Sequence, residues 1–221
     1  MIKKLSTAVL LFAALNNTYA QEASAQKAES PEGYITYKDV MMNAQSSGSS
    51  TIFFENTGTT GSNCDISASE AIMAFLFYGS STAPTFYSPT NTTNVAKNYK
   101  CNGKSWVIGN PSALRATRFR VLVPGTSRVN NIYSLYNANA IKSLDDAFFK
   151  GIAVPGGNTA KYSSSEAATT GIFNTSDAYL IYVHIPDANG GTGHKNALIC
   201  VKEVTYSAGK STIKFDIMVQ K

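Results

Sequence analysis

Alternating side chains near the end of the chain constrain its fold more than any other stretch. In residues 211–220 an apolar side chain recurs at every second position, and most positions between are polar. This period of two is typical of a β-strand with one face on a core and the other largely toward solvent. The alternating apolar residues are Ile213, Phe215, Ile217 and Val219. Only a second layer of structure can bury this face.

Similar signals predict strands along most of the chain. They lie at residues 33–37, 51–55, 71–78, 86–88, 105–108, 118–123, 177–185 and 196–206. The run at 71–78 is apolar throughout and fits a central strand covered on both faces. We therefore expect a mainly β chain, an antiparallel β-sandwich of the jelly-roll or Ig-like kind, with one or two short helices.

One helix is predicted at residues 143–150. Ser143 can cap its start, and Asp145 and Asp146 suit the positive end of a helix dipole. Residues 133–141 can add another turn or two. The acidic pair is thereby explained without a catalytic role.

The beginning of the chain has the pattern of a secretory signal peptide over residues 1–20. A short basic head precedes an apolar run and a small residue at the exit, and the run is too short to span a bilayer permanently. No cysteine follows at the place of lipid attachment. We expect residues 21–32 to be a flexible N-terminal segment and residues 33–221 to form a single β-sandwich domain. The mature protein is expected to be secreted or periplasmic, without an integral membrane segment.

Charge and cysteine content limit the partners and covalent links to be expected of this protein. Charged residues are 15% of the chain, its net charge is +5, and no Lys/Arg run exceeds two residues, so nucleic acid is not an expected partner. Of Cys64, Cys101 and Cys200, two could form a disulfide in an oxidising compartment. Alternatively, all three are small buried hydrophobic residues. Their spacing matches no zinc pattern.

Two histidines offer the clearest candidate chemistry. His184 lies on the strand predicted at 177–185, and His194 lies in the glycine-rich connection that follows it. They could be a metal or haem ligand pair, or one could be an acid–base group beside Asp187. They could also be ordinary polar surface residues. The connection vaguely suggests calcium, but it lacks the spaced carboxylates that calcium needs.

Motifs for covalent catalysis are weak in this sequence. No G-x-S-x-G motif occurs, and acidic residues are few and scattered. An enzyme of the hydrolase class is an alternative that no motif in the sequence supports.

Aromatic residues provide a candidate binding surface. Trp106 is the only tryptophan of the chain, and Tyr87, Tyr99, Tyr133 and Tyr136 fall in or near predicted loops. Exposed rings of this kind stack on sugars and suit recognition surfaces. The alternative is that they belong to the core, which is the simpler explanation for Trp106 because Val107 and Ile108 follow it.

Residues 196–221 form a strand, a short Gly209-Lys210 turn and a strand, and residues 70–89 form an apolar strand before a Phe-Tyr-Ser-Pro step. Both stretches resemble small exported β-sandwich proteins of the Bacteroidetes. The resemblance implies the same fold and export. Some of those proteins bind surface glycans and others scavenge haem, but none of their binding residues can be matched here position by position.

The leading hypothesis is an exported, non-enzymatic binding protein that recognises a glycan or another surface macromolecule, without a cofactor. The first alternative is a haem or metal scavenger that uses His184 and His194. The second alternative is a hydrolase.

Overall fold

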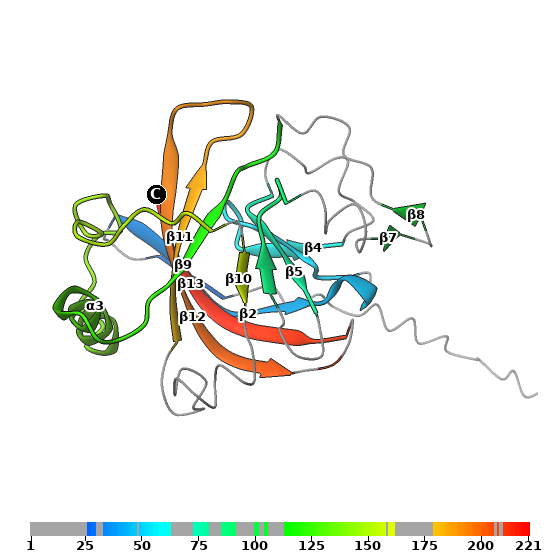
Figure 1. Cartoon of the computed structure of the whole chain (residues 1–221). Helices are drawn as coiled ribbons and strands as arrows, with labels where there is room; N and C mark the ends of the chain where they lie inside the picture. The colour runs from blue at the N-terminus through cyan, green and yellow to red at the C-terminus, as the bar shows by residue number, and fades with distance from the viewer. Residues whose placement is uncertain are drawn as a thin grey trace, which may run out of the picture.

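Two antiparallel sheets packed face to face make up the fold (Figure 1). The computed structural model describes residues 26–29, 33–47, 49–62, 73–79, 85–91, 100–101, 104–105, 113–157, 159–161, 179–205, 207 and 210–221. Within these ranges every pairing between named strands is antiparallel. The expectation of a mainly β, antiparallel sandwich is therefore confirmed.

The larger sheet has six strands in the order β1-β2-β13-β12-β11-β9. Their bounds are β1 Gln26–Glu29, β2 Tyr34–Asn43, β9 Arg118–Val121, β11 Tyr179–Pro186, β12 His194–Thr205 and β13 Thr212–Gln220. The strands predicted at 33–37, 118–123, 177–185, 196–206 and 211–220 all belong to this sheet. The consecutive strands β11, β12 and β13 pair with one another over most of their length, as expected of a hairpin ribbon, and β13 also pairs with β2.

The smaller sheet has five strands in the order β10-β6-β5-β3-β4. Their bounds are β3 Ile52–Phe54, β4 Thr59–Gly61, β5 Phe75–Tyr78, β6 Thr85–Tyr87 and β10 Thr159–Lys161. A separate two-stranded ribbon pairs β7 (Lys100–Cys101) with β8 (Lys104–Ser105). Ser105 of β8 is the first residue of the strand predicted at 105–108, and residues 106–108 lie outside the described residues. The strand predicted at 71–78 begins only at Phe75, since residues 73–74 are buried but lie outside any strand. Phe75, Leu76 and Phe77 are fully buried in the middle strand of this sheet, which confirms the central position for residues 75–78.

The apolar faces of the two sheets meet in an inter-sheet core. Its aromatic members are Tyr37, Phe53, Phe75, Phe77, Phe86, Phe119 and Phe215. Phe215 of β13 lies against rings of the opposite sheet, with centroid distances of 6.1 Å to Phe53 and 5.5 Å to Phe86. All four alternating residues of the final strand belong to this core, which confirms the predicted face.

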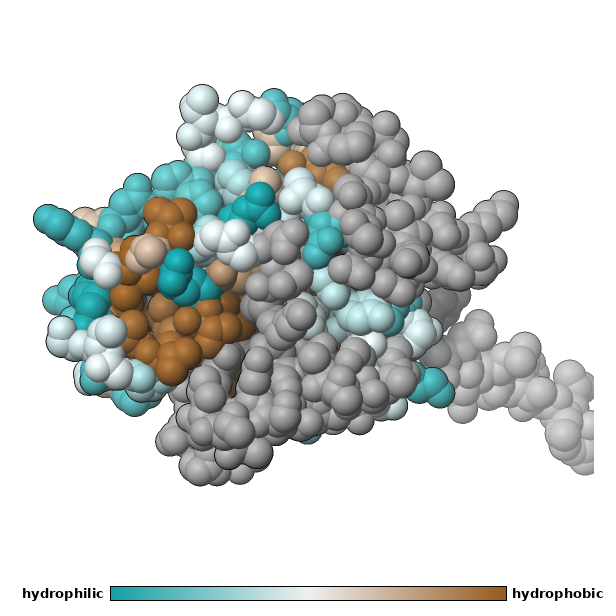
Figure 2. Space-filling model, in the orientation of Figure 1, coloured by the Kyte–Doolittle hydropathy of each residue, from teal (hydrophilic) through white to brown (hydrophobic). Residues whose placement is uncertain are grey.

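The other face of the larger sheet is also partly covered, which the alternation does not predict for β13. An outer cluster forms there from Tyr34, Leu122, Val129, Ile132, Ile141, Leu144, Phe149, Leu180, Tyr182, Leu198, Cys200 and Met218. Met218, expected among the solvent-facing residues, is only 8% exposed. Figure 2 shows apolar surface on the side where Figure 1 draws α3 and the yellow-green segment that follows it.

The helix lies earlier in the chain than residues 143–150, and it includes residues 133–137 of the stretch expected to add helical turns. α3 spans Ser127–Asn137, and the Thr126 side chain caps it by accepting a hydrogen bond from the backbone N–H of Val129 at 3.3 Å. Val129 and Ile132 are its buried residues, and they pack into the outer cluster. Within the described ranges, no helix has the length and apolar character needed to cross a membrane.

Residues 143–150 form turns, so the helix predicted there is wrong. The Ser143 hydroxyl accepts a hydrogen bond from the N–H of Asp145 at 3.1 Å, and the Asp145 carboxylate accepts one from the N–H of Phe148 at 2.8 Å. Short polar side chains that bond to nearby backbone compete with helix formation. The same residues that were expected to start a helix therefore close tight turns.

Residues 26–29, expected in a flexible segment, form strand β1 at the edge of the larger sheet. They pair with β2 from Gln26 opposite Lys38 to Glu29 opposite Ile35. This pairing uses backbone groups, so it needs no apolar pattern that the sequence could reveal. The expected signal peptide at residues 1–20 lies outside the described residues.

Register irregularities interrupt both ladders of β13, and ion pairs connect the strands there. The register shifts between Val201 and Glu203 of β12, and between Phe215 and Ile217 of β13. Asp39 of β2 has φ of 56°, a left-handed conformation that aspartate tolerates. The ammonium groups lie close to the carboxylates: Lys202–Asp216 at 2.7 Å, Lys202–Asp39 at 3.2 Å and Lys214–Asp39 at 3.1 Å.

Replacing Asp39 by asparagine tests the charge of this network, because asparagine tolerates the same backbone. Hydrogen bonds from Lys214 and then Lys202 lower the pKa of Asp39 below its ordinary 3.8. A carboxylate with a depressed folded pKa stabilises the fold above its unfolded pKa, and this contribution is lost as pH falls through the folded pKa. We expect Asp39→Asn to melt below the wild type at neutral pH, with the two melting temperatures converging on acidification below 3.8. A gap that is independent of pH would contradict the charge network.

Phe215→Ala tests the inter-sheet core. The residue is fully buried and stands between rings of the opposite sheet. Loss of a buried phenylalanine costs about 3–5 kcal/mol, which we expect urea denaturation to show. The matched control is Val154→Ala, since Val154 is 64% exposed and surface changes cost within about 0.5 kcal/mol. Equal effects of the two variants would contradict the packing described above.

Candidate functional site

The two histidines come together at one end of the β11–β12 hairpin, whose connection projects beyond the sheets at the top of Figure 1. His184 lies opposite Asn196, and His194 lies opposite Pro186. Because alternate residues of a strand share a face, the histidines and Asn196 lie on the face of the outer cluster. The two imidazole rings have centroids 4.4 Å apart and planes tilted by 38°. We call them the histidine pair.

The connection between the strands folds back on its own aspartate. The backbone N–H of Asp187 donates to the carbonyl of Gly193 at 2.9 Å, and the Asp187 carboxylate accepts from the N–H of Gly193 at 3.1 Å. Asn189 and Gly190 adopt positive φ of 57° and 73°. Asp187 thus stabilises the loop through these bonds. The loop in turn determines the position of His194, the first residue of β12. It is not the carboxylate that binds His194, contrary to one reading of the sequence.

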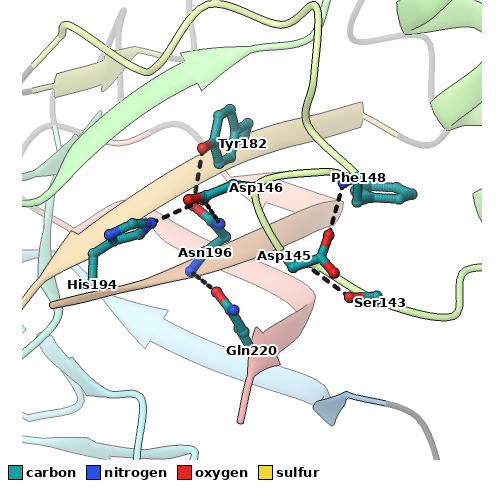
Figure 3. A network of polar contacts seen from close by, with 8 residues as sticks. All are labelled: Ser143, Asp145, Asp146, Phe148, Tyr182, His194, Asn196 and Gln220. Atoms are coloured by element: carbon teal, nitrogen blue, oxygen red, sulfur yellow. Dashed lines mark hydrogen bonds and ion pairs between the residues drawn. The ribbon is translucent and has the colours of Figure 1, made fainter.

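Asp146 is the carboxylate that binds His194 (Figure 3). Its Oδ1 accepts a hydrogen bond from His194 Nε2 at 2.9 Å and another from Asn196 Nδ2 at 2.8 Å. The hydroxyl of Tyr182 donates to Asn196 Oδ1 at 2.9 Å. Asn196 also donates its backbone N–H to the Gln220 side chain at 3.0 Å. The sequence does not indicate this contact, because 48 residues separate Asp146 from His194.

Packing holds Asp146 above the hairpin. The turns of residues 143–150 place Phe149 on the Tyr182 ring, with centroids 3.8 Å apart and planes at 7°. Phe149 is 3% exposed and belongs to the outer cluster. The stacked pair therefore anchors the segment that carries Asp146, although the Asp146 side chain itself is 73% exposed.

Burial, charge and hydrogen bonds shift the pKa values of three groups in this site. The hydrogen bond from His194, followed by that from Asn196, lowers the pKa of Asp146. Burial, and secondly the charge of His194, lowers the pKa of His184. Burial, and secondly Asp146, raises the pKa of Tyr182 to about 12. The site favours an ionised Asp146 beside a neutral His184 and a neutral Tyr182.

One buried ring atom of the pair stands out. Nδ1 of His184 has no hydrogen-bond partner among the residues that the structure describes. Leaving such a group unsatisfied costs about 1–3 kcal/mol, so buried polar atoms of this kind call for an explanation. The His194 side chain is 30% exposed, so the pair is reachable from solvent.

The aromatic residues predicted to bind a ligand do not form one surface. Tyr87 is 7% exposed and packs beside Tyr78 on the smaller sheet. Tyr133 and Tyr136 pack against the outer cluster on the larger sheet. The Tyr133 hydroxyl donates to the Leu122 carbonyl at 2.9 Å and accepts from the Leu180 N–H at 3.2 Å. Tyr99 and Trp106 lie outside the described residues.

Cys200 is a free, buried thiol in the outer cluster. Burial raises its pKa, and also raises the pKa of Tyr136, which hydrogen-bonds to it. A disulfide can therefore join only Cys64 and Cys101, whose side chains lie outside the described part of the chain.

Neither histidine has a hydrogen bond to a serine, threonine or cysteine side chain in the described ranges. The bonds of the pair run to Asp146 and Asn196. Nucleophilic catalysis needs a hydroxyl or thiol within hydrogen-bond reach of the base. The described residues also contain no group of three or more His, Cys, Asp and Glu side chains arranged to hold a metal ion.

Comparison with protein families, curated proteins and solved structures finds no match to this chain. The resemblance to exported Bacteroidetes proteins therefore stays a prediction. What defines the protein at this point is its class: a β-sandwich with a histidine pair at one end. Its function has to be argued from that site.

Gly193→Ala tests the loop that positions His194. A Cβ on Gly193 would lie 2.5 Å from the Asp187 carboxylate oxygen, so this carboxylate must move away from the position in which it accepts from the Gly193 N–H. We expect a loss of about 0.5–3 kcal/mol in denaturation experiments, together with changed NMR signals of both imidazoles. Gly156→Ala is the matched control, because a Cβ there meets nothing within 4 Å. Unchanged imidazole signals in Gly193→Ala would contradict the role given to the loop.

Proposed function

We propose that this protein is a non-enzymatic binding protein that holds a divalent transition-metal ion through His184 and His194. The observation that carries the proposal is the histidine pair, two rings from different strands at 4.4 Å, with one ring nitrogen buried and unpaired. The proposal keeps the expectation of export, which rests on the signal-like pattern of residues 1–20.

The ring separation supports binding of one ion by both imidazoles. Zinc–nitrogen bonds of about 2.0–2.1 Å in a tetrahedral site place two ring centroids roughly 5 Å apart. The observed 4.4 Å is close enough that small rotations of the side chains bring both rings to one ion. Imidazole donors suit zinc, copper and nickel rather than magnesium or calcium. A site with two protein ligands leaves positions for water or an exchangeable ligand.

The protonation state of His184 also supports the proposal. A metal ion binds the neutral imidazole, and burial favours that form of His184. An ion bound at Nδ1 would satisfy the buried atom that now has no partner. The exposed part of His194 gives an ion access from solvent.

The competing ideas receive less support. Axial histidines of a haem stand on opposite faces of the porphyrin, and rings 4.4 Å apart leave no room for a macrocycle between them. A glycan site built on Tyr87, Tyr133 and Tyr136 would draw on rings from two separate clusters. A hydrolase lacks a nucleophile bonded to either histidine in the described ranges.

Titration with zinc tests the proposal. The chain has two histidines in all, so a preparation with a histidine-free tag and no residual metal reports on this site without interference. We expect calorimetry to show about one ion per chain, with His184→Ala and His194→Ala each weakening affinity about tenfold or more, equivalent to about 1.4 kcal/mol. Copper added in place of zinc should give an electron paramagnetic resonance spectrum with coupling to imidazole nitrogen.

Lys195→Ala is the matched control for these variants. Lys195 lies on β12 between His194 and Asn196, and its side chain points to the other face of the sheet. We expect it to bind zinc like the wild type. Absence of binding by the wild type at millimolar zinc, or wild-type affinity in both histidine variants, would refute the proposed function.

A further inference from the structure

We infer that Asp146 is a positioning residue that holds His194 with its proton on Nε2, so that Nδ1 of both histidines faces the ion. This inference rests on the proposed function, since it names the ligating atoms of the same site. It concerns a residue from a segment that is far from the hairpin in sequence and that does not itself bind the ion.

The hydrogen bond between Asp146 and His194 determines which ring nitrogen carries the proton. An ionised carboxylate can only accept hydrogen bonds, so His194 Nε2 must donate in the 2.9 Å contact with Oδ1. A neutral imidazole with a proton on Nε2 has its lone pair on Nδ1. Nδ1 of His194 is therefore the atom available to an ion, as is the unpaired Nδ1 of His184.

A chain of hydrogen bonds keeps the Asp146 carboxylate in place. Because the Tyr182 hydroxyl donates to Asn196 Oδ1 at 2.9 Å, the amide nitrogen of Asn196 is turned toward Asp146 and donates to it at 2.8 Å. Tyr182 is in turn stacked on Phe149, three residues after Asp146. One carboxylate oxygen thus receives two donors from the hairpin (Figure 3). The turn that carries this carboxylate is packed on the sheet through Phe149.

A carboxylate that accepts from the second nitrogen of a histidine is the usual partner of a metal ligand. It fixes the tautomer and ring orientation and raises the basicity of the ligating nitrogen. Loss of such a partner typically weakens metal binding about 10–100-fold. Asp146 meets this description because its carboxylate accepts a hydrogen bond from His194 Nε2. Its neighbour Asp145 does not, because the Asp145 carboxylate bonds to the Phe148 backbone.

NMR of the metal-free protein tests the tautomer directly. Selective ¹⁵N labelling of histidine leaves two rings to assign. The signals that disappear in His184→Ala or in His194→Ala identify the ring that was removed. With the rings in their neutral form, we expect the wild type to show His194 protonated on Nε2 and bare on Nδ1. Asp146→Ala should shift both His194 nitrogen signals toward a mixture of tautomers, with Asp146→Asn intermediate. Unchanged His194 signals in Asp146→Ala would overturn the inference.

Zinc affinity supplies the second measurement. We expect Asp146→Ala to bind zinc about 10–100-fold more weakly than the wild type, while Asp145→Asn, the matched control, binds normally because asparagine keeps the acceptor for Phe148. Wild-type affinity in Asp146→Ala, with loss of binding in His184→Ala, would overturn this inference and leave the proposed function standing. Failure of the wild type to bind zinc would overturn both.

Discussion

Burial on both faces of the strands β11, β12 and β13 is the constraint on which the rest of the structure depends. One face packs against the smaller sheet, where Phe215 meets Phe53 and Phe86. The other face packs against α3 and the segment after it through the outer cluster. Because two apolar layers occupy the middle of these strands, polar side chains on the outer face gather at either end of the cluster. The histidine pair lies at the hairpin end, and Lys202 with Asp216 lies at the register irregularities.

The same two layers determine how the residues of the candidate site are arranged. Register between β11 and β12 sets His184 opposite Asn196 and leaves His194 diagonal to His184. Stacking of Phe149 on Tyr182 brings a turn from elsewhere in the chain to the hairpin. The carboxylate of that turn then completes a hydrogen-bonded group around one imidazole while the other keeps an unpaired nitrogen. The chemistry proposed for the site depends on the strand register and the ring stacking that bring these groups within hydrogen-bond distance.

Local patterns predicted the strands well, because the period of two at 211–220 and the apolar run at 71–78 reflect burial directly. The helix prediction at 143–150 was wrong, because Ser143 and Asp145 bond to backbone amides in tight turns as readily as they cap helices. The sequence suggested both histidines as a ligand pair, but the carboxylate it suggested beside them, Asp187, is not the one that binds His194. Asp187 is near His194 in sequence yet bonds within its own loop, whereas Asp146 arrives through packing.

By itself the sequence determined that the chain builds paired strands with a buried face, since side-chain alternation is a property of consecutive residues. It also determined which residue types were available for chemistry, with two imidazoles in the whole chain. Only the tertiary structure decided that these rings lie 4.4 Å apart, that Asp146 binds one of them, and that Tyr87 lies in a different cluster from Tyr133 and Tyr136. The physical reason is that such contacts arise from strand register and from packing between segments distant in the chain, which no local pattern of residues encodes.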